Sequence, residues 1–166
     1  MKNFDMVKFT NAMEIIKEWD FSLAVRKLQE PSYGSWTEKR ALKAVEDYKR
    51  YLAITKTLNG YQLVPNGDLD EVWHLHLLDT RRYVDDCYTL FGGFLHHYPY
   101  YGMLDEENKQ NWLDNQEFSS DLWNKLFSET LYSESSEAMK CPQACPCVSK
   151  GEKATPNIDV NYRTVA

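Results

Sequence analysis

The sequence lacks an excess of basic residues, a membrane-length apolar stretch and a basic N-terminal segment that leads into an apolar run. A bilayer-spanning helix needs about 20 consecutive apolar residues, so we expect no membrane partner. With 19 Lys and Arg against 25 Asp and Glu, the net charge of −6 argues against a nucleic-acid partner, because phosphates select basic surfaces. Without a secretion signal we expect a cytoplasmic protein whose four cysteines are reduced or bind metal.

The composition is that of a globular helical protein. Hydrophobic residues make up 43% of the 166 residues and aromatic residues 14%. Apolar residues recur at helical spacing, whereas no strand-like alternation of useful length is present. We therefore expect an all-α fold, with a single compact domain of about five helices over residues 1–132. Residues 133–166 are poor in large apolar side chains and are expected to form a flexible, low-complexity tail that contains cysteines.

Capping and stop signals predict where two of the helices begin and end. Ser35 and Glu38 match the capping-box pattern and predict the start of a long helix. Asp68 or Asp70 can cap the next helix. Helical periodicity then continues without interruption to Phe91, where two glycines follow. The sequence thus predicts a single helix through the segment that contains the first two histidines.

Those two histidines belong to the sequence WHLH, residues 73–76. Residues two apart on a helix point about 200° away from each other, so His74 and His76 cannot bind the same ion. His76 falls on the apolar face together with Trp73, Tyr83 and Cys87, and these four residues are expected to be structural. A core histidine of this kind bonds a hydroxyl or backbone group through its ring nitrogens.

His74 lies on another face, four residues after Asp70, at the spacing where helical side chains meet. The chain must reverse after residues 92–93, and the returning segment carries His96 and His97. One of that pair could join Asp70 and His74 in a two-histidine, one-carboxylate set suited to Zn²⁺ or Fe²⁺. The alternative is a surface charge network around Asp70 and His74 without any cofactor.

Three motifs in this region carry a family resemblance. They are D-x-x-W-H-x-H-x-L from Asp70 to Leu78, Y-x-x-D-C from Tyr83 to Cys87, and F-x-H-H-x-P-x-x-G from Phe94 to Gly102. Together they resemble the glycine-rich domain-containing protein-like family, formerly a domain of unknown function, over roughly residues 35 to 105. The chain lacks the long glycine-rich region and resembles the short bacterial members. The resemblance strengthens the grouping of the histidines and implies no activity.

The expected tail contains a second cluster of metal-binding residue types. Cys141, Cys145 and Cys147 form a C-x₃-C-x-C pattern that matches no standard zinc or iron–sulfur motif. Three thiolates at this spacing could bind Zn²⁺ or Cu⁺, or form a reversible disulfide. The alternative is an ordinary reduced tail.

Three functional interpretations remain open. In the first, the chain is a metal-binding helical domain, and an open coordination position would allow catalysis. In the second, it is a non-catalytic interaction module whose tail contacts an unidentified protein partner. In the third, the domain is a leader or carrier for a cysteine-rich tail that is modified or binds metal. No pattern in the sequence names a substrate, and the question of enzymatic activity stays open.

Overall fold

The computed structural model describes residues 4–59, 61, 63–133, 136 and 138. All regular elements in this part of the chain are helices, which confirms the all-α expectation. The six helices are α1 (Met6–Ile16), α2 (Ser22–Gln29), α3 (Glu38–Thr57), α4 (Gly67–Leu78), α5 (Thr80–Phe91) and α6 (Glu106–Phe127). None of the described helices is long and apolar enough to cross a membrane.

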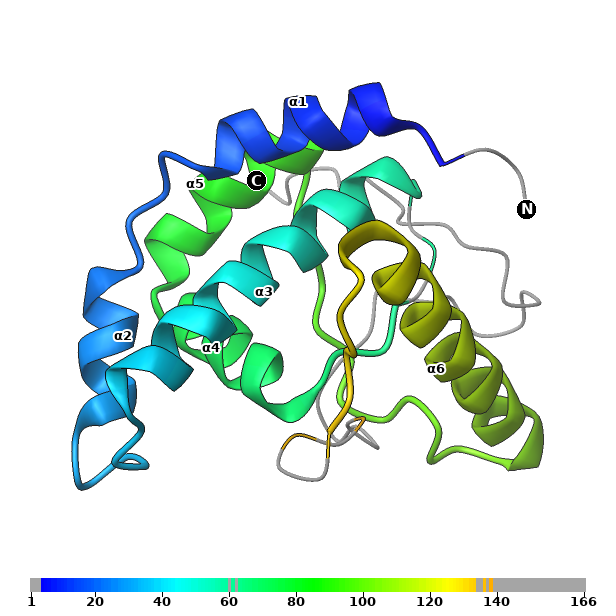
Figure 1. Cartoon of the computed structure of the whole chain (residues 1–166). Coiled ribbons are helices and arrows are strands. Elements are labelled where there is room, and N and C mark those ends of the chain that lie inside the picture. Colours follow the sequence, from blue (N-terminus) through cyan, green and yellow to red (C-terminus); the bar gives the residue numbers. More distant parts are fainter. Residues whose placement is uncertain (1–3, 60, 62, 134–135, 137, 139–166) are drawn as a thin grey trace, which may run out of the picture.

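The central element is α3, against which α1, α2 and α4 pack (Figure 1). It is the helix with the most buried positions, and its apolar stripe includes the buried Tyr48, Tyr51 and Leu52. α5 packs against both α4 and α1. α4 is therefore held between α3 and α5, which fixes the orientation of the WHLH sequence relative to the core.

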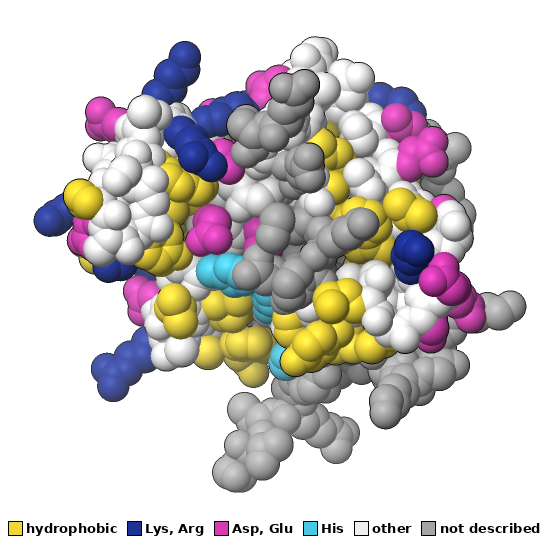
Figure 2. Space-filling model, turned by 90° about the horizontal axis from the view of Figure 1, so that it is seen from below, with side chains coloured by type: hydrophobic (Ala, Val, Ile, Leu, Met, Phe, Trp, Pro, Cys, Tyr) yellow, Lys and Arg dark blue, Asp and Glu magenta, His cyan; other side chains and the backbone are white. Residues whose placement is uncertain are grey.

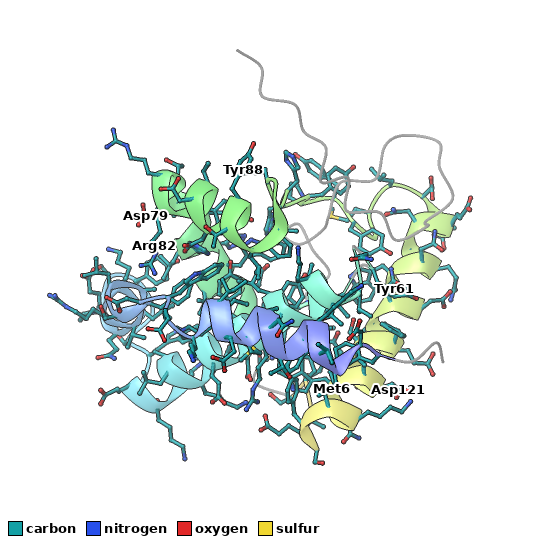
Figure 3. All side chains as sticks on the ribbon, turned by 90° about the horizontal axis from the view of Figure 1, so that it is seen from above. Met6, Tyr61, Asp79, Arg82, Tyr88 and Asp121 are labelled. Carbon is teal, nitrogen blue, oxygen red and sulfur yellow. The ribbon has the colours of Figure 1, made fainter. Side chains whose placement is uncertain are left out.

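The helix that was expected to run through to Phe91 is broken at Asp79, so this prediction is wrong. Asp79 is the C-cap of α4 and the N-cap of α5, with φ −82° and ψ 69°, outside the helical region. Its backbone N–H donates to the Leu75 carbonyl, and its own carbonyl accepts from Tyr83. Asp79 lies at the surface beside Arg82 (Figure 3). The break lets α5 turn back beside α4 and accounts for the sixth helix.

The predicted caps also differ from the observed ones. α3 begins after Thr37, whose hydroxyl accepts from the Arg40 backbone N–H, because Ser35 has a φ of 50° and lacks the extended backbone of an N-cap. α4 is capped by Asn66, whose side-chain oxygen accepts from the Leu69 N–H. Asn66 also donates to a backbone carbonyl near the end of the described chain, an interaction that no local pattern encodes.

The C-terminal end of α5 follows the prediction. Gly92 has a φ of 76° and forms the left-handed C-cap at which the chain leaves the helix. The segment that follows returns over the domain and buries Leu95 and Tyr101. Tyr101 and Trp112 of α6 form a small second cluster with Val64.

The expected tail begins at residue 133, and three of its residues are described. The backbone N–H of Asp68 donates to the Ser136 hydroxyl, and Ala138 forms an antiparallel bridge with Asn66. Ser136 and Ala138 therefore lie against the start of α4. Cys141, Cys145 and Cys147 lie outside the described residues.

Candidate metal centre

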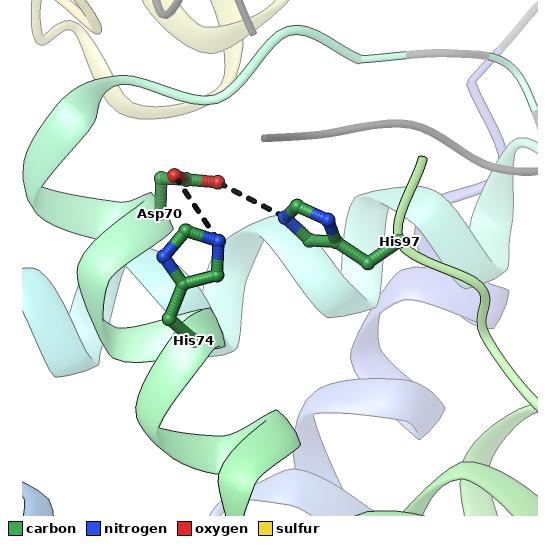
Figure 4. Close-up of side chains that lie close together, drawn as sticks. All are labelled: Asp70, His74 and His97. Carbon is green, nitrogen blue, oxygen red and sulfur yellow. Dashed lines mark ion pairs between the residues drawn. The ribbon is translucent and has the colours of Figure 1, made fainter. Parts of the chain in front are cut away.

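Asp70 and His74 face the same side of α4, one helical turn apart. The Nε2 atom of His74 lies 3.7 Å from the Asp70 Oδ2 atom. From the returning segment, the Nε2 atom of His97 approaches the other carboxylate oxygen, Oδ1, at 3.5 Å. Figure 4 shows the carboxylate facing both imidazoles, with a dashed line to each. One ligand atom from each of the three residues can be chosen so that all lie within 4.8 Å of one another.

His97 reaches this position because the returning segment is tied to α5 and α4. The Tyr83 hydroxyl donates to the backbone carbonyl of Leu95, two residues before His97. The same hydroxyl accepts from the indole N–H of Trp73 at 3.0 Å. Trp73 in turn packs edge-on against the His97 ring, with centroids 4.7 Å apart. The buried Trp73–Tyr83 pair thus positions His97 beside α4.

Asp70 is the most unusual residue of the group because its carboxylate is buried and makes no hydrogen bond. Its side chain is 1% exposed, and neither oxygen has a hydrogen-bond partner in the described structure. The Nε2 atom of His97 also lacks one. Buried polar atoms are nearly always paired, since an unpaired one costs about 1–3 kcal/mol or more. Three unpaired ligand atoms that converge on one point suggest a missing partner.

Burial also changes the protonation of the group. Desolvation, followed by repulsion from Glu71, raises the pKa of Asp70 to about 8. The pKa of His97 is lowered to about 4, mainly by desolvation and to a smaller extent by repulsion from the neighbouring His74. The pKa of His74 is lowered by desolvation as well. At neutral pH both imidazoles are therefore neutral, the form in which histidine binds metals.

The spacing of the ligand atoms suits an ion better than a hydrogen bond. Contacts of 3.5 and 3.7 Å between His nitrogens and carboxylate oxygens exceed the usual hydrogen-bond range of about 2.7–3.2 Å. An ion about 2.1 Å from each ligand in tetrahedral geometry places the ligands roughly 3.4 Å apart. The two contacts to Asp70 are close to this value, and the complete set of one ligand atom per residue lies within 4.8 Å. Histidine side chains also gather beside acidic side chains on one face of the molecule (Figure 2). The arrangement can therefore hold a transition metal near the surface.

The structure distinguishes the two adjacent histidines of the returning segment. His97 belongs to the three-residue group, whereas His96 does not. The His96 ring instead packs against Phe94, with centroids 4.8 Å apart. Sequence reasoning had left the two equivalent, because neighbouring residues in an extended segment point to opposite sides and the direction of the return was unknown.

His76 points away from the metal group into the core. Its Nδ1 atom lies 2.9 Å from the Tyr48 hydroxyl, and its Nε2 atom lies 3.1 Å from a carboxylate oxygen of Asp86. The Tyr48 hydroxyl is a partner of the expected kind. The sequence does not identify either residue, since Tyr48 comes from α3 and Asp86 is brought near only by the break at Asp79. Cys87 is a buried free thiol, and desolvation raises its pKa to about 11.

Comparison with known proteins finds one related family. A family model described as UCP032817-like matches residues 11–140, most of the chain, including all three residues of the metal group. No curated protein and no solved structure matches the chain. The expected membership of the glycine-rich domain-containing protein-like family is therefore wrong. The three motifs behind that expectation are short and local, whereas the family match extends from within α1 to beyond the end of α6.

Proposed function

We propose that this chain, which belongs to the UCP032817-like family, binds a divalent transition metal. The description of the family names no activity, so the proposal depends on the site itself. Asp70, His74 and His97 supply the ligands. The observation that carries the proposal is the buried Asp70 carboxylate, which makes no hydrogen bond and stands between two imidazole nitrogens. Zn²⁺ and Fe²⁺ are the ions that this donor set suits best.

A bound ion accounts for the electrostatics of the site. Without it, folding must bury a carboxylate whose pKa is raised to about 8. With it, two positive charges face the carboxylate and restore its ionised form, and the neutral imidazoles donate their free nitrogen lone pairs. Three protein ligands leave at least one coordination position of the ion for water or another ligand. The ion would then act as a Lewis acid or as a structural link between α4 and the returning segment.

Metal analysis of the purified protein tests this proposal. The protein is prepared without chelator, loaded with Zn²⁺ or, under anaerobic conditions, Fe²⁺, and desalted before its metal content is measured. Asp70→Asn and His97→Gln should lose the ion. His96→Gln is the matched control, because it changes a histidine of the same segment that lies outside the ligand group, and it should keep the ion.

The result that would overturn the proposal is equally specific. A wild-type protein that is helical by circular dichroism yet retains no stoichiometric Zn²⁺ or Fe²⁺ contradicts a metal site. So does equal metal retention in wild type, Asp70→Asn and His97→Gln, because the ion would then be bound elsewhere on the chain.

A further inference from the structure

A pocket away from the metal group opens between α2 and the break that separates α4 from α5. It has a volume of about 160 Å³. None of the three proposed metal ligands lines it, so it is a separate site. Its lining includes Phe21, Ala24, Leu75, His76, Asp79 and Arg82.

Apolar and aromatic side chains form one wall of the pocket. The ring of the buried Phe21 packs edge-on against the His76 ring, with centroids 5.1 Å apart. Both ring nitrogens of His76 are already engaged by Tyr48 and Asp86, so His76 contributes surface and no free nitrogen. A cavity of about 150 Å³ can hold benzene, so this pocket has room for an apolar group of similar size.

Arg82 supplies a positive charge that is held in place. Its Nε atom lies 3.4 Å from a carboxylate oxygen of Asp86, and its guanidinium carbon lies 5.1 Å from the centre of the Phe21 ring. Among the described residues, the terminal amino groups of Arg82 have no hydrogen-bond or ion-pair partner. A guanidinium binds a carboxylate through two parallel hydrogen bonds. Arg82 is therefore available to the carboxylate of a ligand in the pocket.

Asp79 supplies a negative charge at the same pocket. Its side chain is exposed and does not cap α5. It comes three residues before Arg82 and lies on the same side of the molecule (Figure 3), yet no ion pair joins these two described residues. The Asp79 carboxylate is therefore available to the ammonium group of a ligand.

The other charged residues of the lining already have partners. Asp20 accepts a hydrogen bond from the backbone N–H of Ser22, and Lys27 pairs with Glu30 at 2.8 Å. The pocket thus presents one available positive group and one available negative group beside an apolar wall. A simple anion would be repelled by the carboxylate and a simple amine by the guanidinium, whereas a ligand with both charges is attracted by both groups.

We infer that the pocket binds a small zwitterion, namely an α-amino acid with an apolar side chain. Arg82 binds its carboxylate and Asp79 binds its ammonium group. The side chain of the ligand packs against Phe21, Ala24 and Leu75. Binding needs no metal, so this inference does not depend on the proposed metal site.

A nuclear magnetic resonance titration of the full-length, isotope-labelled protein with L-phenylalanine tests the inference. Chelator is present throughout, because an amino acid could otherwise bind through a metal ion. The backbone N–H resonances of Phe21 and Ala24 should shift until the site is saturated. For a ligand of this size we expect a dissociation constant on the order of a millimolar or less.

Three related compounds show which groups of the ligand are recognised. Phenylpropionate lacks the ammonium group and phenethylamine lacks the carboxylate, and each should bind about tenfold more weakly than L-phenylalanine. Each loses one charge-assisted contact and keeps the repulsion from the other charged group. Glycine keeps both charges but has no apolar side chain, so it should also bind about tenfold more weakly or less.

Variants of the pocket assign each charge to its residue. Arg82→Gln should weaken binding of L-phenylalanine about tenfold and leave phenethylamine binding no weaker. Asp79→Asn should weaken L-phenylalanine by a similar factor and leave phenylpropionate binding no weaker. Arg81→Gln and Asp85→Asn are the matched controls, because they remove exposed charges from the same helix, and they should bind as wild type does.

Two results would overturn the inference. One is a folded wild-type protein whose pocket resonances do not shift to saturation with L-phenylalanine. The other is binding that Arg82→Gln and Asp79→Asn leave unchanged, because the ligand would then lie elsewhere on the chain. If Arg82→Gln does not fold, the compounds still decide on wild type, since equal affinity for L-phenylalanine, phenylpropionate and phenethylamine contradicts recognition of both charges.

Discussion

Replacement of Asp70 by asparagine should stabilise the metal-free protein and abolish its stabilisation by metal. The substitution keeps the side-chain volume and removes a buried carboxylate whose pKa is raised from 3.8 to about 8. Above pH 3.8 the unfolded chain releases this proton while the folded protein keeps it. The folded state therefore loses stability, at about 1.4 kcal/mol per pH unit, until the pH reaches the folded pKa.

The effect of Asp70 on the free energy of unfolding is best measured at pH values above those at which the histidines titrate. Burial lowers the pKa values of His74, His76 and His97 from 6.5, so these groups destabilise the folded protein only as the pH falls below that value. Between pH 6.5 and about pH 8 the Asp70 contribution amounts to about 2 kcal/mol. Wild type should lose this stability over the window, and Asp70→Asn should not.

Urea denaturation followed by circular dichroism, with chelator present, gives the free energy of unfolding at both ends of the window. Asp85→Asn is the control, because Asp85 is an exposed carboxylate on the neighbouring α5. It should show the wild-type pH dependence. An identical pH dependence in wild type and Asp70→Asn would refute the reasoning, because the carboxylate would then be ionised in the folded protein.

Zn²⁺ should stabilise wild type and leave Asp70→Asn nearly unchanged, so the difference in stability between them should become smaller. An ion present at a hundredfold excess over its dissociation constant stabilises the folded state by about 2.7 kcal/mol. Wild type and Asp85→Asn should gain this amount, and Asp70→Asn should gain little. Equal stabilisation of Asp70→Asn and wild type would also count against the proposed site.

Three further outcomes follow from the contacts around the site. Tyr83→Phe removes the acceptor of the Trp73 indole N–H and the donor to the Leu95 carbonyl. Urea denaturation should show that the free energy of unfolding falls by about 1–3 kcal/mol, and Zn²⁺ affinity should fall as well. Unchanged affinity would mean that the hydrogen bond to Leu95 does not position His97. His76→Ala leaves a core cavity and two unpaired partners, so the free energy of unfolding should fall by about 2–5 kcal/mol. Metal stoichiometry should not change. Loss of the ion from a folded variant would contradict the assignment of His74, and not His76, to the metal group. Cys87 is buried, and its pKa is raised to about 11. A thiol reagent should therefore modify it only after denaturation, which mass spectrometry can measure. Rapid labelling of Cys87 in the native protein would contradict its place in the core.

The sequence predicted the helical class because apolar residues at helical spacing survive in every long element. It could not predict the break at Asp79, because Asp79 interrupts neither the periodicity nor the composition of the segment. The N-caps of α3 and α4 were predicted at the wrong residues for a related reason. Ser35 has the right residue type for a cap, but the turn before α3 puts it in the left-handed region.

The candidate site was predictable in outline only. Helical geometry alone separates His74 from His76 and pairs His74 with Asp70. The choice between His96 and His97 depends on the path of the returning segment, which the bond from Tyr83 to the Leu95 carbonyl fixes. That contact joins two elements, so it follows from tertiary packing and not from residue spacing. The family resemblance is wrong because it depends on three short motifs, which cover only part of the chain, whereas the matching family model covers residues 11–140.

The contacts that build the site have a consequence for the order of folding. The Trp73–Tyr83 and His76–Asp86 contacts each join residues ten apart, and the Tyr83–Leu95 contact joins residues twelve apart. Such short loops close rapidly and at little entropic cost. We expect α4, α5 and the returning segment to form a local folding unit, which can assemble on the ribosome before α6 has been synthesised. The metal ligands would then meet early, and α6 would add to a site that already exists.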